Sequence, residues 1–148
     1  MSPRQLEQTV SWTIKIGLAL LTVLPLYVSS GMLFPFITGK NFAFRILVEV
    51  LAALWVGLMM GWPQYRPKLT PLLKLSTIFI LIVFLADLFS PNPYRAFFSN
   101  YERMEGFMMI FHLWLYFLML SSVLKSGRDW LIFAHTALLA GVAVGLVG

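Results

Sequence analysis

The side chains best suited to bind a charged ligand lie in two short segments of an otherwise apolar sequence. Residues 90–106 contain Arg95, Tyr101, Glu102, Arg103 and Glu105, and residues 38–49 contain Lys40, Arg45 and Glu49. The planar guanidinium group of arginine matches the oxygens of a phosphate, and it stays charged wherever it lies. If the two segments meet at one surface, their cations form a binding site for a lipid-linked phosphate or diphosphate.

Structural explanations stay open at these positions. Arg45 and Glu49 lie four residues apart on one helix face, where they can neutralise each other, although arginine before glutamate is the weaker order. Glu102, Arg103 and Glu105 suit the solvated start of a helix as well as they suit a binding site.

Other kinds of chemistry are excluded by what the sequence lacks. It has no cysteine, which rules out disulfides, thiolate metal sites and cysteine nucleophiles. No motif indicates a metal site, a nucleotide-binding loop or a nucleophile paired with a base. His112 and His135 each stand alone in an apolar segment, and we interpret both as structural. We therefore expect no metal and no other cofactor, and the catalytic residues stay unknown.

The elements that must position these residues are membrane helices. The chain is 59% hydrophobic and only 11% charged, with a mean hydropathy of +0.83, whereas soluble domains carry about 25% charged residues. A helix of about 20 residues crosses the apolar core of a bilayer, and an open chain can cross it only as a helix. We predict an all-α, polytopic transmembrane protein in which the whole chain, residues 1–148, forms a single transmembrane region. About five helices span the membrane, at residues 16–36, 42–61, 72–89, 107–124 and 130–147.

The distribution of lysine and arginine predicts the orientation. With a cytoplasmic N-terminus, seven of them face the cytoplasm: Arg4, Lys15, Arg66, Lys68, Lys74, Lys125 and Arg128. The remaining four, Lys40, Arg45, Arg95 and Arg103, face the other side. The positive-inside rule favours this arrangement. Because topology explains the net charge of +5, we expect no nucleic-acid partner.

Local patterns refine the helix predictions. Ser99 and Glu102 match a capping box, which predicts a helix that starts at Ser99 and runs into the fourth span. Small residues at four-residue spacing, Ala137, Gly141 and Gly145, predict close helix packing in the last span, as do Gly57 and Gly61 in the second. The last span reaches the end of the chain without a cap or a polar tail, so we expect the N-terminal part of a longer protein.

Two segments carry a family resemblance. Residues 34–55, FPFITGKNFAFRILVEVLAALW, and residues 92–107, NPYRAFFSNYERMEGF, resemble the N-terminal region of bacterial O-antigen ligase-like and O-antigen polymerase-like membrane proteins. In that family a TGKNF-x-FR segment followed by a glutamate opens the second helix, and an SNYERMEG segment opens the fourth. The resemblance covers most of the chain before its last apolar segment.

The resemblance implies a multi-pass protein of the bacterial inner membrane that serves lipopolysaccharide and cell-envelope synthesis. Such ligases move a glycan from an undecaprenyl diphosphate carrier to a lipid or glycan acceptor at the outer face, without a metal. The implied partners are membrane lipid, the undecaprenyl diphosphate-linked glycan and the remainder of the same polypeptide. The family's best-supported catalytic residues lie in a C-terminal half that this sequence lacks, so we expect the chain alone to be inactive.

A non-enzymatic membrane protein, such as a transporter or an assembly scaffold, is the alternative. Transporters often show internal repeats and broken helices near the middle of the membrane. The apolar segments show no convincing repeat, and the charged residues gather towards one face. These patterns favour a surface site over a translocation path.

Overall fold

The structure, a computed structural model, describes residues 2–27, 37–100 and 105–147. The described residues form helices and connections without a strand, which confirms the all-α prediction. The elements in chain order are α1 (Pro3–Leu21), η1 (Leu24–Leu26), α2 (Thr38–Gly61), η2 (Pro63–Tyr65), α3 (Pro71–Leu88), α4 (Pro93–Phe98), α5 (Phe107–Val123) and α6 (Gly127–Val147).

Prolines and small polar residues set several of the helix starts. Pro3, Pro71 and Pro93 each occupy the first turn of a helix, where the missing N–H would have no partner in any case. The preceding residue caps each of these helices through its side chain: Ser2 Oγ accepts from Gln5 N, Thr70 Oγ1 from Leu73 N, and Asn92 Oδ1 from Arg95 N. These boundaries are local properties of the sequence.

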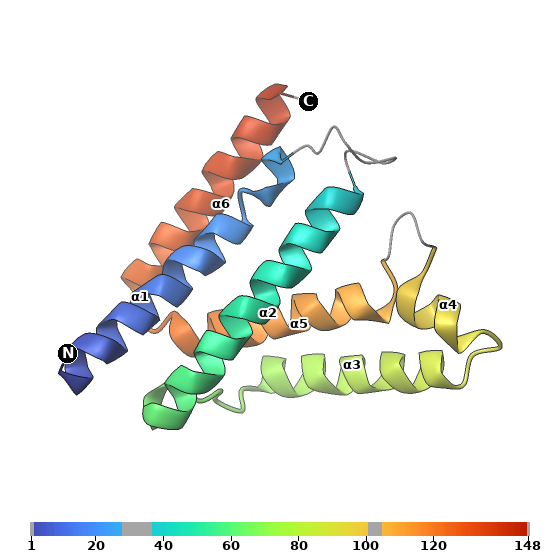
Figure 1. The fold of residues 1–148 in the computed structure, drawn as a ribbon, viewed down its shortest axis with the longest axis horizontal. Coiled ribbons are helices and arrows are strands. Elements are labelled where there is room, and N and C mark those ends of the chain that lie inside the picture. The colour runs from blue at the N-terminus through green and yellow to red at the C-terminus, as the bar shows by residue number, and fades with distance from the viewer. Residues whose placement is uncertain (1, 28–36, 101–104, 148) are drawn as a thin grey trace.

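The helices form two groups. Figure 1 shows the axes of α1, α2 and α6 similarly inclined, with α2 running opposite to α1 and α6, whereas α3 and α5 run across them. We call the proximal end the one where α1, α3 and α6 begin and α2 and α5 end, and the distal end the opposite one. The short helix α4 lies at the distal end and packs against α3 and α5.

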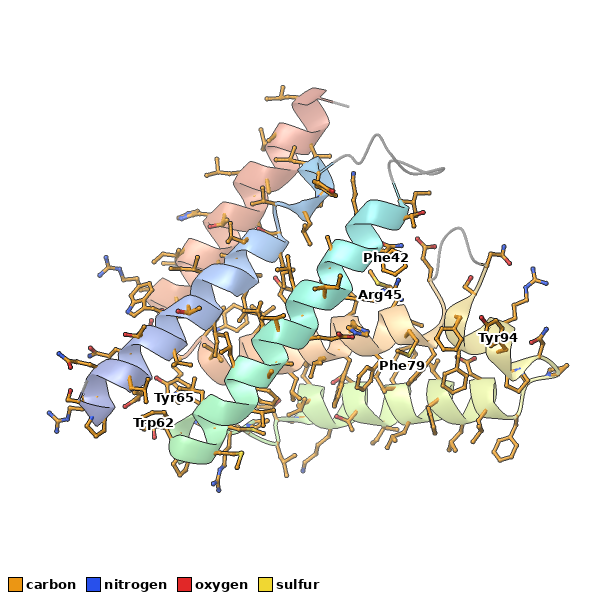
Figure 2. All side chains as sticks on the ribbon, in the orientation of Figure 1. Phe42, Arg45, Trp62, Tyr65, Phe79 and Tyr94 are labelled. Carbon is orange, nitrogen blue, oxygen red and sulfur yellow. The ribbon has the colours of Figure 1, made fainter. Side chains whose placement is uncertain are left out.

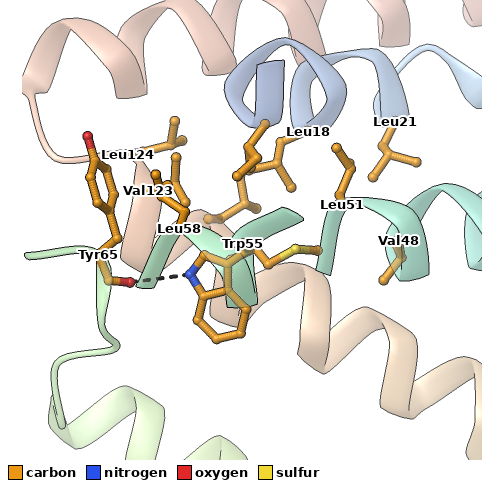
Figure 3. Packing of buried hydrophobic residues seen from close by; sticks show 12 residues of the cluster. Leu18, Leu21, Val48, Leu51, Trp55, Leu58, Tyr65, Val123 and Leu124 are labelled. Atoms are coloured by element: carbon orange, nitrogen blue, oxygen red, sulfur yellow. Dashed lines mark hydrogen bonds between the residues drawn. The ribbon is translucent and has the colours of Figure 1, made fainter. Parts of the chain in front are cut away.

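The core lies where α1, α2 and α5 meet (Figure 3). Ile14, Leu18, Val48, Met119 and Val123 have no exposed surface there. Polar groups near this core are paired: the Trp55 indole N–H donates to the carbonyl of Tyr65 at 3.3 Å, and the Tyr116 hydroxyl donates to the carbonyl of Leu18 at 2.9 Å. The pairing is expected, because an unpaired buried polar group is costly.

Three helices are long and apolar enough to cross a membrane: Thr38–Gly61, Pro71–Leu88 and Gly127–Leu146. A shorter apolar helix, Phe107–Val123, has 17 residues. Large apolar side chains are exposed along α3 and α6, for example Ile82 and Leu139. A face of this kind is stable against lipid rather than water, so the structure indicates a membrane protein.

The bounds predicted for the first span, residues 16–36, are wrong. The helix begins at Pro3, because Ser2 and Gln5 form a capping box well before the apolar run. It ends at Leu21, because the ring of Pro25 would clash with the carbonyl of Leu21 in a continuing helix. Residues 28–36 of the predicted span lie outside the described residues.

The helix start predicted at Ser99 is also wrong. Ser99 ends α4 instead, with its N–H bonded to the carbonyl of Arg95 at 2.7 Å and a φ of 59°. A helix N-cap needs an extended backbone, which this φ excludes. The sequence pattern missed Asn92 and Pro93, which start a helix earlier in the segment, and α5 begins only at Phe107.

The small-residue stripes do not pack against other described helices. A Cβ atom placed at Gly57, Gly61, Gly141 or Gly145 meets no described atom within 4 Å. The close approach is made by Gly17 instead, where a Cβ would lie 2.5 Å from the Leu51 side chain. A small residue therefore permits close packing, but the rotation of its helix decides whether a neighbour uses it.

Candidate functional site

The cations of α2 are held by main-chain oxygens at the distal end. The ammonium group of Lys40 donates to the carbonyl of Pro25 at 2.5 Å, which connects α2 to η1. The guanidinium carbon of Arg45 lies 4.8 Å from the centre of the Phe42 ring, and its Nε donates to the carbonyl of Asn41 at 3.3 Å (Figure 2). Both side chains are half-buried, so their positions are set by the fold.

Glu49 bonds to a histidine from another helix. Its Oε1 lies 3.0 Å from Nε2 of His112 on α5, and His112 Nδ1 lies 2.6 Å from the carbonyl of Met108. The His112 side chain is only 4% exposed, whereas that of Glu49 is 63% exposed. The pair therefore joins α2 to α5 among apolar side chains, near the middle of α2.

The geometry of this pair requires a proton between the two side chains. The Met108 carbonyl can only accept, so the hydrogen of that bond belongs to Nδ1. The bond between Nε2 and Oε1 then needs one more proton, which either the ring or the carboxyl group carries. In both forms the pair has no net charge, which lowers the cost of placing it between membrane helices.

Sequence reasoning missed this pair, because it treated His112 as isolated and considered Arg45 as the partner of Glu49. The sequence signal for this pair is the position of both residues inside apolar helices rather than at their ends. Glu49 and His112 are ionisable residues inside apolar helices, Glu49 at the middle of α2 and His112 in the second turn of α5. Such residues usually pair with each other or face a wet cavity.

The remaining described candidates lie on or near α4. Arg95 is exposed on this helix, next to Tyr94, whose ring packs at a tilt against Phe98 with 5.1 Å between centroids. Glu105 is exposed just before α5. Figure 2 shows Tyr94 and Arg45 on different helices, with Tyr94 on α4 and Arg45 on α2. The predicted site residues Tyr101, Glu102 and Arg103 lie outside the described residues.

An apolar groove runs between α3, α4 and α5. Its volume is about 490 Å³, within the range of about 300–1,000 Å³ typical of ligand pockets. The lining residues are Thr77, Ile80, Leu81, Phe84, Phe97, Phe107, Met108, Phe111 and Trp114. The aromatic rings pack edge to face around its distal part, with Phe84 and Phe97 at 5.6 Å. The groove suits a long hydrocarbon chain.

Two features mark the distal end of the groove. Phe97 of α4 and Phe107 of α5 both line it and lie 5.3 Å apart between ring centres. Arg95 lies on the same short helix as Phe97, so a charged group emerging beside α4 would meet a guanidinium group. The described residues contain no cluster of histidine and acidic side chains that could hold a metal ion.

Comparison with known proteins adds no relative: no protein-family model, curated protein or solved structure matches the chain.

Proposed function

We propose that this chain binds an undecaprenyl diphosphate-linked glycan, as the N-terminal membrane portion of an O-antigen ligase-like glycosyltransferase. The reaction would transfer the glycan to a lipid or glycan acceptor at the outer face of the bacterial inner membrane. The observation that carries the proposal is the apolar groove between α3, α4 and α5, which reaches the helix that bears Arg95. The resemblance of residues 34–55 and 92–107 to that family supports it.

The groove and the cations suit the two parts of such a carrier. Aromatic and aliphatic side chains line the groove, and burial of apolar surface contributes roughly 25 cal/mol per Å². The diphosphate would lie beside α4, where Arg95 is exposed to solvent and free to turn towards it. Lys40 and Arg45 lie in the distal part of α2, and they would add positive potential at this end of the molecule.

The chemical role proposed for these cations is stabilisation of the departing diphosphate. Negative charge develops on the leaving group during glycan transfer, and fixed cations that meet this charge lower the barrier. We assign the described residues to carrier binding and none of them to proton transfer at the acceptor. In the family that the chain resembles, that step belongs to the C-terminal half.

The proposed topology places the N-terminus and the proximal end in the cytoplasm. Lys15, Arg66, Lys68, Lys125 and Arg128 lie at or near the proximal end, as the positive-inside rule requires. We further propose five crossings, with α1 and α5 added to the three helices of sufficient length. At 17 residues α5 extends about 26 Å, slightly less than the apolar core of a typical bilayer.

Binding of undecaprenyl diphosphate to the full chain in lipid nanodiscs tests the proposal. Arg95→Gln should weaken binding about tenfold, because it removes one charge-assisted contact worth about 1.5 kcal/mol. It should leave binding of undecaprenol, which lacks the diphosphate, unchanged. Leu81→Trp should weaken both ligands, because Leu81 lines the groove and is half exposed. Native mass spectrometry of the bound lipid measures each affinity.

Lys74→Gln is the matched control, since it removes one positive charge near the start of α3, far along this helix from α4. It should bind both ligands as the unmodified chain does. If both Arg95→Gln and Leu81→Trp bind undecaprenyl diphosphate as the unmodified chain does, neither the groove nor Arg95 binds the carrier, and the proposal is wrong.

A further inference from the structure

A second, cationic groove lies at the proximal end, away from α4. Its volume is about 330 Å³, and it is formed by the connection from η2 to α3 and by the end of α5. Arg66, Lys68 and Lys125 line it together with Ser121 and Ser122, and none of the described residues that line it is acidic. Three positive side chains therefore share one small recess.

Two carboxylates near the groove are already engaged. Asp129 Oδ2 accepts from the backbone N–H of Lys125 at 3.3 Å, and its Oδ1 pairs with Lys15. Glu7 Oε1 accepts hydrogen bonds from the Gln64 amide at 2.7 Å and from the Tyr65 hydroxyl at 3.2 Å. The Lys125 ammonium group lies 3.4 Å from the centre of the Tyr65 ring. Burial lowers the pKa of Lys125 from its usual 10.5, and repulsion by Lys15 and Lys68 adds to this shift against the attraction of Glu7. The cations are close enough to repel one another.

A charge count leaves this recess positive. The ends of α2 and α5 lie beside it, and each helix C-terminus contributes about −0.5 of a charge. Arg66 lies against the end of α2, since its Nε donates to the carbonyl of Met59 at 3.3 Å. Three cations set against Glu7 and two helix ends leave a surplus of about one positive charge. Lys15 does not add to it, because Lys15 pairs with Asp129 at 2.9 Å.

The surroundings of the recess match a membrane interface. Leu69 and Leu72, which follow Lys68, are 76% and 63% exposed. Trp62 and Tyr65 lie at the same end of α2 (Figure 2), and aromatic residues of this kind gather at the level of lipid headgroups. A binding site for a freely diffusing anion has no need of exposed leucines at its edge. Basic pockets between helices on the cytoplasmic side are known binding places for anionic headgroups.

We propose that this proximal groove binds the phosphate of an anionic phospholipid in the adjoining leaflet, with Lys68, Lys125 and Arg66 as its ligands. A single phosphodiester carries one negative charge, which balances the surplus of the recess. The acyl chains would lie against the exposed apolar residues that follow Lys68. The proposal does not depend on the function assigned to the distal end, because the two sites share no residue.

The test is lipid retention by the full chain in phosphatidylcholine nanodiscs that contain phosphatidylglycerol. Native mass spectrometry should show phosphatidylglycerol retained about tenfold more strongly than phosphatidylcholine. The double variant Lys68→Gln, Lys125→Gln should lose most of this preference. The matched control Lys74→Gln, Arg128→Gln loses the same charge from residues that do not line the groove, and it should keep the preference.

The result for the unmodified chain already decides the proposal, whether or not the variants fold. Equal retention of the two phospholipids would overturn it, and so would equal losses in the two double variants. Inorganic phosphate added to phosphatidylcholine nanodiscs distinguishes the source of the anion. Saturable phosphate binding without any preference for phosphatidylglycerol would assign the recess to a soluble anion and overturn the lipid assignment.

Discussion

His112 shows how one side chain defines a polar centre between apolar helices. Its ring is almost fully buried, and both ring nitrogens are bonded to oxygens, the Met108 carbonyl and the Glu49 carboxyl group. Because Nδ1 must donate, the proton on the other side of the ring is shared with Glu49. The Glu49 side chain, in contrast, is 63% exposed. The shared proton can pass between the His112 ring and the Glu49 carboxyl group without changing the net charge of the pair.

Glu49→Gln should preserve this centre, whereas Glu49→Ala should not. The amide N–H of glutamine can donate to Nε2 of a neutral ring, which replaces the shared proton by a permanent one. Alanine leaves a buried nitrogen without a partner, which costs about 1–3 kcal/mol. Thermal unfolding in detergent should therefore show a clearly lower Tm for Glu49→Ala and a nearly unchanged Tm for Glu49→Gln.

Nitrogen NMR of the ring provides an independent check. The signal of His112 should show a protonated Nδ1 in both the unmodified chain and the Glu49→Gln variant. A ring with a bare Nδ1 would contradict the geometry, since the contact to the Met108 carbonyl would then join two acceptors.

Among the helices, α4 is the one that positions Arg95 and Phe97 at the distal end of the apolar groove. Asn92 and Pro93 start it, Ser99 ends it, and Phe97 packs on Phe107 at the beginning of α5. The contact is possible because Gly106 has no side chain: a Cβ there would overlap the backbone carbonyl oxygens of Ala96 and Phe97. The α4–α5 junction is thus fixed by backbone packing, and it lies at the distal end of the apolar groove.

Gly106→Ala should open this junction. Because the overlapping atoms belong to the backbone, α4 must move, and we expect a loss of about 1–3 kcal/mol in the free energy of unfolding. Gly57→Ala is the control on α2, where a Cβ meets no described atom within 4 Å. There alanine should stabilise the helix by up to about 1 kcal/mol. Equal unfolding free energies for the two variants would show that α4 does not pack as described.

At the scale of the whole molecule, the two helix groups create two different ends. The proximal end gathers the cationic groove, Glu7 and the Lys15–Asp129 pair, so its charges are partly balanced. The distal end carries α4 and the start of α2, with the apolar groove between α3, α4 and α5. We propose that these ends face opposite sides of the membrane, and the two ligands proposed for them are both anionic.

Single cysteine substitutions test this orientation, and the absence of native cysteine removes background labelling. Tyr94 at the distal end and Leu69 at the proximal end are both 76% exposed, which makes them a matched pair. A membrane-impermeant maleimide applied to intact spheroplasts should label Tyr94→Cys. It should label Leu69→Cys only after permeabilisation. The reverse pattern would place the distal end in the cytoplasm and remove it from the proposed reaction.

Short-range features were predictable from the sequence. The all-α class and the approximate positions of α2, α3, α5 and α6 follow from long apolar runs, because a backbone in lipid must satisfy its hydrogen bonds within each segment. The failures at the first span and at Ser99 are also local. At the first span, the capping box of Ser2 and Gln5 starts the helix well before the apolar run. At Ser99, the start formed by Asn92 and Pro93 prevails over the capping-box pattern of Ser99 and Glu102.

The tertiary structure alone decided which side chains meet. Glu49 and His112 are 63 residues apart, and Arg66 and Lys125 reach one groove from segments separated by the helices α3, α4 and α5. Such partners depend on the rotation and tilt of each helix, which are set by contacts such as Gly17 against Leu51 and Gly106 against the end of α4. Spacing along the chain determines the face of a helix on which a residue lies. The partner of that face is determined by how the helices pack, because many side chains from distant segments must fit together at once.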